Sequence, residues 1–436
     1  MGQHLVILSS AEAVEDLLLK RGAIYSDRPT LAMQQLSGWE YAYATLRYGE
    51  RFRATRRLSG RVMNSRASRD YIPMQEQAMR RLLKMLLVTP ERFEHHIKSA
   101  AGSIVLKLAY DYDTVDDHDP LVDLADRALE IFSVSSKPHW AVNLFPALRY
   151  LPHWFPGCGF LGQAAIWKKV VREMYKRPFE MAKKNMQTES GHDSMIAKML
   201  EGDGESPSPD LEELVMLCVG SLYGGVSQTV SAGLSFLLAM TLYPDVQHRA
   251  QAEIEAITGG DRLPTYNDRE RMPYVDALIQ EVHRWNPVLP CGLPHFCSTE
   301  DVYRGFRIPS GSTVLANVWH ITHDPKIYPE PFAFNPDRYL GDTVGSSVNP
   351  DPKGFIFGFS RRECPGRFVA DASVWLMVAT TLATFNIGMA TDENGQPLVP
   401  DVKYSSGILR RVRRLHPLSF PCKIVPKSPR AAALVG

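Results

Sequence analysis

The sequence predicts a mainly α-helical protein with a smaller β region. Several stretches have helical apolar periodicity, and one of them, from Leu214 to Pro244, contains no charged residue. The strand-like stretches are few and short, with one at the N-terminus and one between residues 305 and 317. The chain has 436 residues, of which 44% are hydrophobic, so it can bury a large core. Because no repeat or low-complexity tract divides it, we expect one domain over residues 1–436.

The composition argues against several classes of protein. Lys+Arg number 49 and Asp+Glu 48, so the formal charge of +1 gives no reason to expect a nucleic-acid partner. The six cysteines form no CxxC pair and have no regular spacing, which argues against a zinc site and a disulfide scaffold and suits a reducing compartment. The apolar run in residues 1–8 is too short for a membrane anchor, and we expect a strand there.

The first third of the chain is predicted to contain amphipathic helices and one irregular segment. We expect a helix from Ser10, which can cap it, to Lys20. A second helix, over residues 48–58, brings Arg53, Arg56 and Arg57 close together, which in isolation indicates a solvated basic face. The aromatic, proline-punctuated stretch 144–160 is not a regular element. It is either a buried loop or, if exposed, an apolar patch suited to a membrane surface or a substrate entrance.

The uncharged stretch is the longest predicted helix. We expect Asp210 to cap it, with Glu213 completing a capping box. Its length would allow it to span a bilayer, but polar and small residues cluster at mid-span, which favours a helix buried in a large α-protein. Further helices are expected over residues 245–257 and 268–285, followed by a hairpin with a Pro/Gly turn at 305–317.

The chemistry of the chain is concentrated at Cys364. This residue ends a Gly/Ser/Arg-rich loop and precedes an apolar, helix-competent run, residues 368–385. Pro365 suits the first turn of that helix, which would place Cys364 at the helix N-terminus, where free amides and the dipole favour a thiolate. Such a thiolate can bind heme iron. The alternative is a buried free cysteine before a core helix.

This loop resembles the cysteine loop of the cytochrome P450 family of heme-thiolate monooxygenases, which reads Phe-x-x-Gly-x-Arg-x-Cys-x-Gly. Phe357, Arg362, Cys364 and Gly366 match that pattern, whereas Ser360 stands where the family has a glycine and should add local strain. The resemblance implies the cytochrome P450 fold, with heme b between a long central helix and the cysteine loop. Cys364 would be the iron ligand, and Phe357, Arg362 and Gly366 would belong to the cofactor pocket.

Other positions extend the resemblance over nearly the whole chain. The family has a Trp-x-x-x-Arg helix that reaches the heme propionates, and Phe52 and Arg56 occupy those two positions. His295 lies where relatives place a basic residue on a propionate, although a lone histidine is more often structural. The resemblance also implies a buried ion network that locks the cysteine loop, formed by Glu281, Arg284 and Arg338.

The proton path departs from the family pattern. The family has an Ala/Gly-Gly-x-Asp/Glu-Thr segment in the central helix, which Gly224 and Gly225 begin here. Ser227 then replaces the acid and Gln228 the threonine, with Thr229 one position later. We take Ser227, Gln228 and Thr229 as the candidate catalytic residues. Because neither Ser nor Gln exchanges a proton near neutral pH as a carboxylate can, we expect a poorly coupled oxygenase that leaks peroxide.

The resemblance also implies function and partners. The expected reaction inserts one oxygen atom of O2 into a small apolar substrate, with NADPH electrons delivered by a flavoprotein reductase. Arg361 and Arg367 could help form a basic face for that reductase, or be an ordinary solvated pair. The closest branch is fungal secondary metabolism, with a terpenoid as one example of a substrate. The alternatives are an O2-independent heme-thiolate enzyme, peroxide-driven or rearranging, and a non-catalytic heme- or ligand-binding relative.

Two features bear on location. Eukaryotic relatives carry an N-terminal membrane helix and a hinge before the strand that starts this sequence, so we expect a shortened chain. It would lie at the endoplasmic reticulum surface with a peripheral membrane contact, or in the cytoplasm. The basic run from Arg410 to Arg414 is unusual for the family and is expected to be an insertion.

Overall fold

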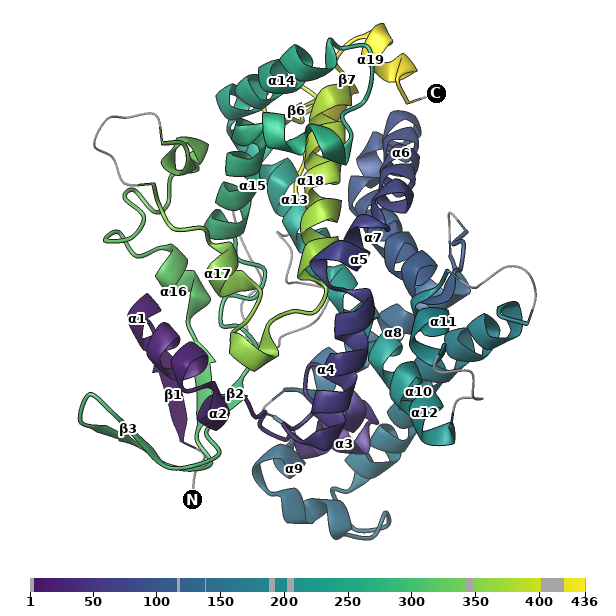
Figure 1. Ribbon diagram of the computed structural model, residues 1–436, viewed down its shortest axis with the longest axis vertical. Helices are drawn as coiled ribbons and strands as arrows, with labels where there is room; N and C mark the ends of the chain where they lie inside the picture. The colour runs from purple at the N-terminus through teal and green to yellow at the C-terminus, as the bar shows by residue number, and fades with distance from the viewer. Residues whose placement is uncertain are drawn as a thin grey trace.

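Helices dominate the computed structural model of this chain, which describes residues 4–115, 118–137, 139–187, 193–201, 208–341, 348–400 and 419–435. The predicted fold class is therefore confirmed (Figure 1). The basic run at Arg410–Arg414 lies outside the described residues. The helices are α1 (Ala11–Val14), α2 (Gly22–Tyr25), α3 (Ala32–Leu36), α4 (Glu50–Val62), α5 (Ser65–Arg69), α6 (Ile72–Val88), α7 (Phe93–Tyr110), α8 (Pro120–Ser135), α9 (Ala141–Leu144), α10 (Gly159–Asn185), α11 (Met195–Leu200), α12 (Pro209–Gly220), α13 (Val226–Leu242), α14 (Pro244–Thr258), α15 (Pro273–Trp285), α16 (Val318–Thr322), α17 (Lys353–Ile356), α18 (Arg367–Thr384) and α19 (Pro429–Ala433). The strands are β1 (Leu5–Leu8), β2 (His295–Phe296), β3 (Asp301–Tyr303), β4 (Phe306–Ile308), β5 (Thr313–Ala316), β6 (Phe385–Met389) and β7 (Cys422–Pro426).

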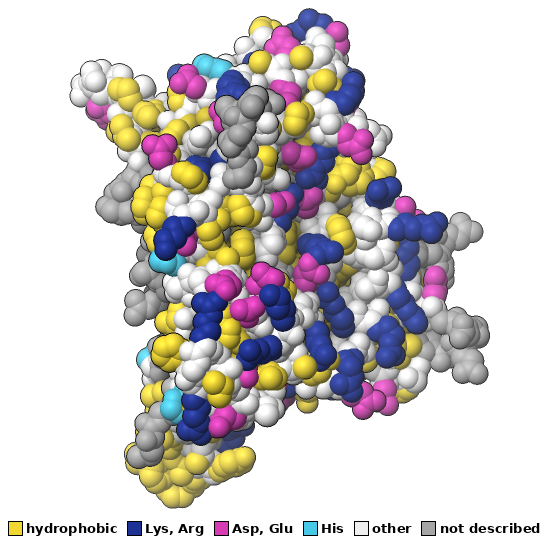
Figure 2. All heavy atoms as spheres, turned by 60° about the vertical axis from the view of Figure 1, so that its left-hand side comes forward, with side chains coloured by type: hydrophobic (Ala, Val, Ile, Leu, Met, Phe, Trp, Pro, Cys, Tyr) yellow, Lys and Arg dark blue, Asp and Glu magenta, His cyan; other side chains and the backbone are white. Residues whose placement is uncertain are grey.

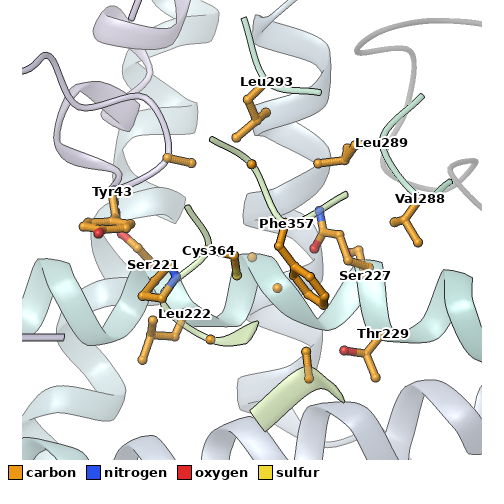
Figure 3. A pocket seen from close by; sticks show the side chains of 18 of the residues that line it. Tyr43, Ser221, Leu222, Ser227, Thr229, Val288, Leu289, Leu293, Phe357 and Cys364 are labelled. Carbon is orange, nitrogen blue, oxygen red and sulfur yellow. Dashed lines mark hydrogen bonds between the residues drawn. The ribbon is translucent and has the colours of Figure 1, made fainter. Parts of the chain in front are cut away.

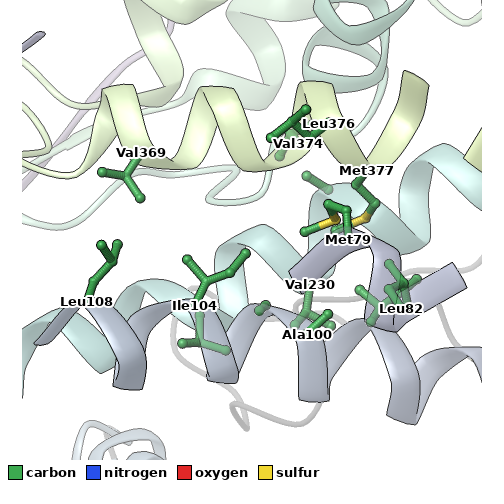
Figure 4. Packing of buried hydrophobic residues seen from close by; sticks show 14 of the residues in the cluster. Met79, Leu82, Ala100, Ile104, Leu108, Val230, Val369, Val374, Leu376 and Met377 are labelled. Atoms are coloured by element: carbon green, nitrogen blue, oxygen red, sulfur yellow. The ribbon is translucent and has the colours of Figure 1, made fainter. Parts of the chain in front are cut away.

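The main core is built where α13 packs against α7 and α18 and where α6 packs against the same two helices, and Figure 4 shows apolar side chains of these helices meeting. The helices approach closely at Gly233 of α13. A Cβ atom there would lie 2.7 Å from Met377 Sδ and 3.1 Å from Ile97 Cγ2, so a larger residue would push α13 away from α18 and α7. This packing holds α13 through the centre of the protein.

The predicted N-terminal strand is confirmed, but the predicted hairpin is paired differently. β1 runs parallel to β5, and β2 pairs with β5 on its other side. The hairpin lies one strand earlier, between β3 and β4, where Arg304 and Gly305 both have positive φ. Two consecutive residues with positive φ form a two-residue hairpin turn, and the twist of this turn matches the twist of the two strands that it joins. The Pro/Gly turn at 309–311 instead redirects the chain toward β1.

The helix from Ser10 is confirmed, since Ser10 Oγ accepts from Ala13 N at 3.2 Å; it continues as the π-helical segment η1 (Glu15–Lys20). The capping prediction at Asp210 is wrong. Ser208 caps α12 through Leu211 N, because Pro209 takes the first helical position and leaves the cap to the residue before it.

The uncharged stretch is not one continuous α-helix. Helix α12 ends at Gly220, the 3-10 segment η5 (Ser221–Gly225) follows, and α13 begins at Val226. In the described chain, the stretch Pro209–Leu242 is long and apolar enough to cross a membrane, but 72% of its most apolar window is buried inside the protein. The structure therefore supports the buried central helix.

The aromatic stretch after α9 lies on the surface. Leu144 is 64% exposed, Tyr150 84% and Trp154 81%, and Phe145 and Phe155 are also exposed. Hydrophobic side chains gather at the lower end of the molecule in Figure 2, the end that α9 occupies in Figure 1. Of the two predicted alternatives, the exposed apolar patch is confirmed.

Candidate active site

A cavity of about 390 Å³ lies between the Cys364 loop and the start of α13 (Figure 3). Most of its wall is apolar and includes Leu222 from η5 and Val288, Leu289 and Leu293 from the segment after α15. The predicted residues that line it are Ser227, Gln228, Thr229, His295, Phe357, Arg362, Cys364 and Gly366. The fold thus brings together residues that are spread over about a third of the sequence.

The Cys364 loop is a tight turn that holds the sulfur in place. Cys364 N donates to Phe357 O at 2.6 Å. Gly358 has φ +81°, and a Cβ there would come within 2.9 Å of Arg362 O, so the turn requires glycine at this position. Ser360 has φ 49°, the left-handed conformation that costs a side-chain-bearing residue energy. The predicted local strain is confirmed.

The protein surroundings alone do not favour the Cys364 thiolate as the sequence predicted. Burial raises the pKa of the Cys364 thiol, and the Gly366 amide and the Arg56 guanidinium oppose that rise only in part. The prediction gave the helix N-terminus more weight than the loss of solvent. A metal ion that binds the sulfur displaces its proton, so the thiolate depends on the iron as well as on the loop.

The three predicted propionate residues lie in different environments. Arg362 is buried, donates to Ser26 O and Leu46 O, and lies over the Phe52 ring at 3.8 Å. His295 is buried and its Nδ1 lies 2.7 Å from Tyr25 O. Arg56 is not among the residues that line the cavity. Its Nη1 donates to Tyr43 Oη at 3.1 Å and to Glu363 O at 2.5 Å, so it contacts the backbone of the cysteine loop.

The candidate catalytic residues Ser227, Gln228 and Thr229 lie in the first turn of α13, which begins at Val226. With the amide oriented so that its nitrogen faces the carbonyls, Gln228 Nε2 donates to Gly224 O at 2.6 Å and to Gly225 O at 3.2 Å. These carbonyls belong to η5, where the helix changes its winding. Gln228 therefore braces the break between α12 and α13. Ser227 and Thr229, the sequence neighbours of Gln228, also line the cavity.

The predicted ion network lies outside the cavity and is fully desolvated. Both Glu281 oxygens accept from Arg284, at 2.7 and 2.8 Å, and Arg338 Nε lies 3.0 Å from Glu281 Oε2. The side chains of Glu281 and Arg284 are 0% exposed and that of Arg338 is 4% exposed. The arginines also donate to the backbone carbonyls of Pro329, Pro331 and Ala333. The network thus ties α15 to the segment that contains η7 (Pro336–Tyr339).

Two buried residues of the cavity wall were not predicted from the sequence. Arg28, in the segment between α2 and α3, is 6% exposed and lines the cavity. His283 follows Glu281 in α15, and both of its ring nitrogens are buried without a hydrogen-bond partner among the described residues. In the sequence, His283 stands between Glu281 and Arg284 of the predicted ion network, and no pattern marks Arg28 as buried. Their burial depends on distant segments.

The cavity fits the heme that the resemblance predicts. Its wall is mostly apolar, as a porphyrin face requires, and one sulfur from Cys364 reaches it. Arg362 Nη1 is buried with no hydrogen-bond partner in the described chain, although a guanidinium without solvent needs an acceptor. A propionate carboxylate would supply that acceptor.

Comparisons with known proteins bear on the family and the fold of this chain. The family model described as "Cytochrome P450" matches residues 1–410. Cytochrome P450 monooxygenase 208 of Postia placenta is 39% identical over 100% of this chain and 84% of its own length. Cytochrome P450 monooxygenase claR of Ampulloclitocybe clavipes is 40% identical over 100% of this chain and 80% of its own. A solved zebrafish cytochrome P450 with progesterone is 22% identical, with a TM-score of 0.77 over 98% of this chain and 95% of that one.

Proposed function

This chain belongs to the cytochrome P450 family and is a heme-thiolate monooxygenase, and from this premise we propose that it oxidises a small apolar molecule in fungal secondary metabolism, such as a terpenoid. The apolar wall of the cavity supports the substrate class, because desolvation of such a molecule is the main favourable contribution to its binding. The origin of the relatives in fungi supports the metabolic setting.

The observation that carries the proposal is Cys364 at one wall of a mostly apolar cavity, with the start of α13 at the other wall. When bound, heme supplies the iron at which O2 is activated for transfer of one oxygen atom to carbon. Cys364 would supply the sulfur ligand of the iron, and the turn from Phe357 to Cys364 holds this residue in position. Leu222, Val288 and Leu289 exclude water and place the substrate.

Proton supply is assigned to the segment at the start of α13. Gln228 has its amide nitrogen engaged by two carbonyls, so we assign it the role of a brace. Ser227 and Thr229 retain hydroxyl groups that can hold an ordered water at the cavity wall. The loss of a carboxylate here is also the one observation that favours the peroxide-driven alternative, since that chemistry needs no proton delivery to O2.

Electrons are proposed to come from NADPH through a flavoprotein reductase. Arg361 donates to Tyr48 Oη at 2.8 Å and Arg367 pairs with Glu363, so both arginines near Cys364 have local partners and are only partly available for docking. If these arginines contribute to docking, Arg361→Glu should slow the reduction of the heme by the reductase without changing the affinity for substrate. An unchanged rate would exclude Arg361 from the docking surface.

A peripheral membrane contact is proposed for the apolar patch formed by Leu144, Phe145, Tyr150, Trp154 and Phe155. These side chains would insert among lipid headgroups, and a membrane is the natural source of an apolar substrate. Such a contact would place the protein at the endoplasmic reticulum surface.

The proposed function is tested by the spectrum of the reduced protein under carbon monoxide. The wild type should show the thiolate-type band, and Cys364→Ser should lose it while keeping its helical content. Cys422→Ser, at a cysteine outside the cavity, should leave the band unchanged. A protein without heme, or a thiolate band that survives in Cys364→Ser, would contradict the proposal. Product formed with reductase and NADPH, but not with peroxide alone, separates it from the peroxide-driven alternative.

A further inference from the structure

The indole of Trp39 is a buried hydrogen-bond donor in the wall of the cavity. Trp39 begins the 3-10 segment η2 (Trp39–Tyr41), is 3% exposed and lines the cavity. Its Nε1 is buried and has no hydrogen-bond partner among the described residues. A buried indole N–H usually has an acceptor, and leaving a buried donor unpaired is costly. Because the ring lines the cavity, a ligand there can supply the acceptor.

Packing fixes the direction of this donor. The Trp39 ring meets Phe132 of α8 edge to face, with ring centroids 5.2 Å apart, and Tyr175 of α10 in the same way at 6.1 Å. Gly38, the residue before it, has φ +89°, and a Cβ there would lie 3.3 Å from Lys168 Cγ, so the start of η2 lies close against α10. The indole is thus preorganised, and a ligand that binds it loses little affinity to ordering of the side chain.

Trp39 belongs to the part of the cavity wall that packs against α8 and α10. Among the lining side chains that the structure describes, three have buried polar atoms without a hydrogen-bond partner: Trp39, His283 and Arg362. Arg362 belongs to the cysteine loop, and the centroid of the His283 ring lies 6.4 Å from that of Phe357 in the same loop. Trp39 is therefore the unpaired donor that a substrate, rather than the cofactor, would meet.

The cavity wall around Trp39 is neutral. The lining residues that α8, α10 and α11 contribute carry no charge and are Leu129, Phe132, Ser133, Met174 and Met195. A carboxylate beside Trp39 would find no cation among them, and burying it unpaired would be costly. Ser221 is already engaged, since its Oγ accepts from Tyr43 N at 3.1 Å and donates to Leu217 O at 2.7 Å (Figure 3). This part of the wall therefore suits a neutral oxygen that needs one donor.

We propose that Trp39 is a specificity-determining residue, whose Nε1–H donates to a neutral oxygen of the substrate, a hydroxyl or a carbonyl. The inference rests on the proposed function, because it takes the cavity as the site of oxidation. It narrows the substrate class to apolar molecules that already carry an oxygen. A reaction that installs or retains such an oxygen must then supply the substrate.

Binding of a matched pair of probes provides the test. Nootkatone is an apolar sesquiterpenoid ketone, and valencene is the hydrocarbon with the same carbon skeleton. Dissociation constants for both are measured from the shift of the heme absorption band in the wild type, Trp39→Phe and Met174→Leu. The ratio of the two constants should change about fivefold against nootkatone in Trp39→Phe, as expected for the loss of one neutral hydrogen bond. Met174→Leu is the matched control, because it alters the same part of the wall without removing a donor and should keep the ratio within twofold.

Two outcomes would overturn the proposal: the same ratio in Trp39→Phe and wild type, or no spectral shift with nootkatone in the wild type. If Trp39→Phe yields no heme-loaded protein, the variant with β-(3-benzothienyl)alanine at position 39 decides, because this residue keeps the two-ring shape and has no N–H. A thiolate-type band under carbon monoxide in the same samples would show that the proposed function stands even where this inference fails.

Discussion

Gln228 has a carboxamide at the position where the family has the threonine of its proton path, so this residue bears most directly on proton supply. Its nitrogen is occupied by the Gly224 and Gly225 carbonyls, and it has no proton to release near neutral pH. We predict that the wild type consumes more NADPH than it forms product and releases the difference as peroxide. The double variant Ser227→Asp/Gln228→Thr should raise product per NADPH several-fold, because a positioned acid speeds proton transfer by about 10²–10⁴-fold.

The measurement is NADPH oxidised, peroxide released and product formed in one reconstituted reaction. Gln228→Met serves as the control for the brace, since it roughly keeps the length of the side chain, removes the two amide donors and adds no acid. Tight coupling in the wild type, or no gain in the double variant, would contradict the prediction.

Ser360 stores strain next to Cys364, and this can be relieved. Its φ of 49° is left-handed, and a Cβ added at Gly22 would lie 2.6 Å from its hydroxyl oxygen. Ser360→Gly should therefore stabilise the protein by about 1 kcal/mol, seen as a higher urea midpoint with an unchanged heme spectrum. Gly22→Ala should be destabilising alone and close to neutral in the Ser360→Gly background. If Gly22→Ala lowered the free energy of unfolding equally in the wild type and in Ser360→Gly, residues 22 and 360 would not interact.

Individual residues were predictable from the sequence when their role is local. The Cys364 turn could be recognised because its pattern is contiguous, and the strain at Ser360 followed from one missing glycine. Arg28 and His283 could not be recognised, because what buries them comes from Leu293, Pro294 and Phe357, far along the chain. The consequence of burial for the Cys364 pKa was missed for the same reason.

At the scale of elements, one ion network fixes α15 against the segment of η7. Arg338→Met should leave Glu281 buried with one partner fewer and destabilise the protein by about 3–5 kcal/mol, with faster heme loss. Arg249→Met is the matched control, because Arg249 binds Asp337 beside Arg338 at 2.7 Å but both side chains are about half exposed. That variant should lose less than about 1 kcal/mol. Similar urea midpoints for the two variants would contradict the prediction.

The existence of the elements was easier to predict than their ends and partners. Apolar periodicity identified α14 and α15, and long apolar runs identified α13 and α18, which are buried on nearly all sides. It could not show the break at η5, which depends on the Gln228 side chain reaching back to two carbonyls. Strand pairing was wrong because the partner of β5 is the first strand of the chain, which no local pattern reveals.

For the whole molecule, buried neutral histidines make stability depend on pH. Burial lowers the pKa of both His283 and His323 to about 4, whereas histidine in an unfolded chain titrates near 6.5. Because the folded pKa is the lower one, protons bind the unfolded chain first. Each neutral ring makes its full contribution to the free energy of unfolding above about pH 6.5, and this contribution is lost as the pH falls toward 4. Each should account for about 2 kcal/mol between pH 7 and 5.

Urea unfolding at these two pH values measures this loss. His283→Leu removes one titrating ring, so the difference in free energy of unfolding between pH 7 and 5 should shrink by about 2 kcal/mol. The same difference in variant and wild type would show that His283 is protonated or solvated in the folded protein.

The exposed apolar patch formed by Leu144, Phe145, Tyr150, Trp154 and Phe155 is predicted to bind the protein to membranes. Replacing Tyr150, Trp154 and Phe155 by serine should reduce co-sedimentation with phospholipid vesicles severalfold, because the loss of large apolar side chains weakens insertion. Val88→Ser is the control, since Val88 is 79% exposed but ends α6 outside this patch. Unchanged co-sedimentation of the triple variant would exclude the patch as the contact.

The pairing of β1 with β5 also has a consequence for biosynthesis. Leu5 to Leu8 leave the ribosome long before their hydrogen-bonding partners, Thr313 to Ala316, have been translated. Closing so large a loop is entropically expensive and slow. Strand β1 therefore remains unpaired and accessible to chaperones until β5 has been translated.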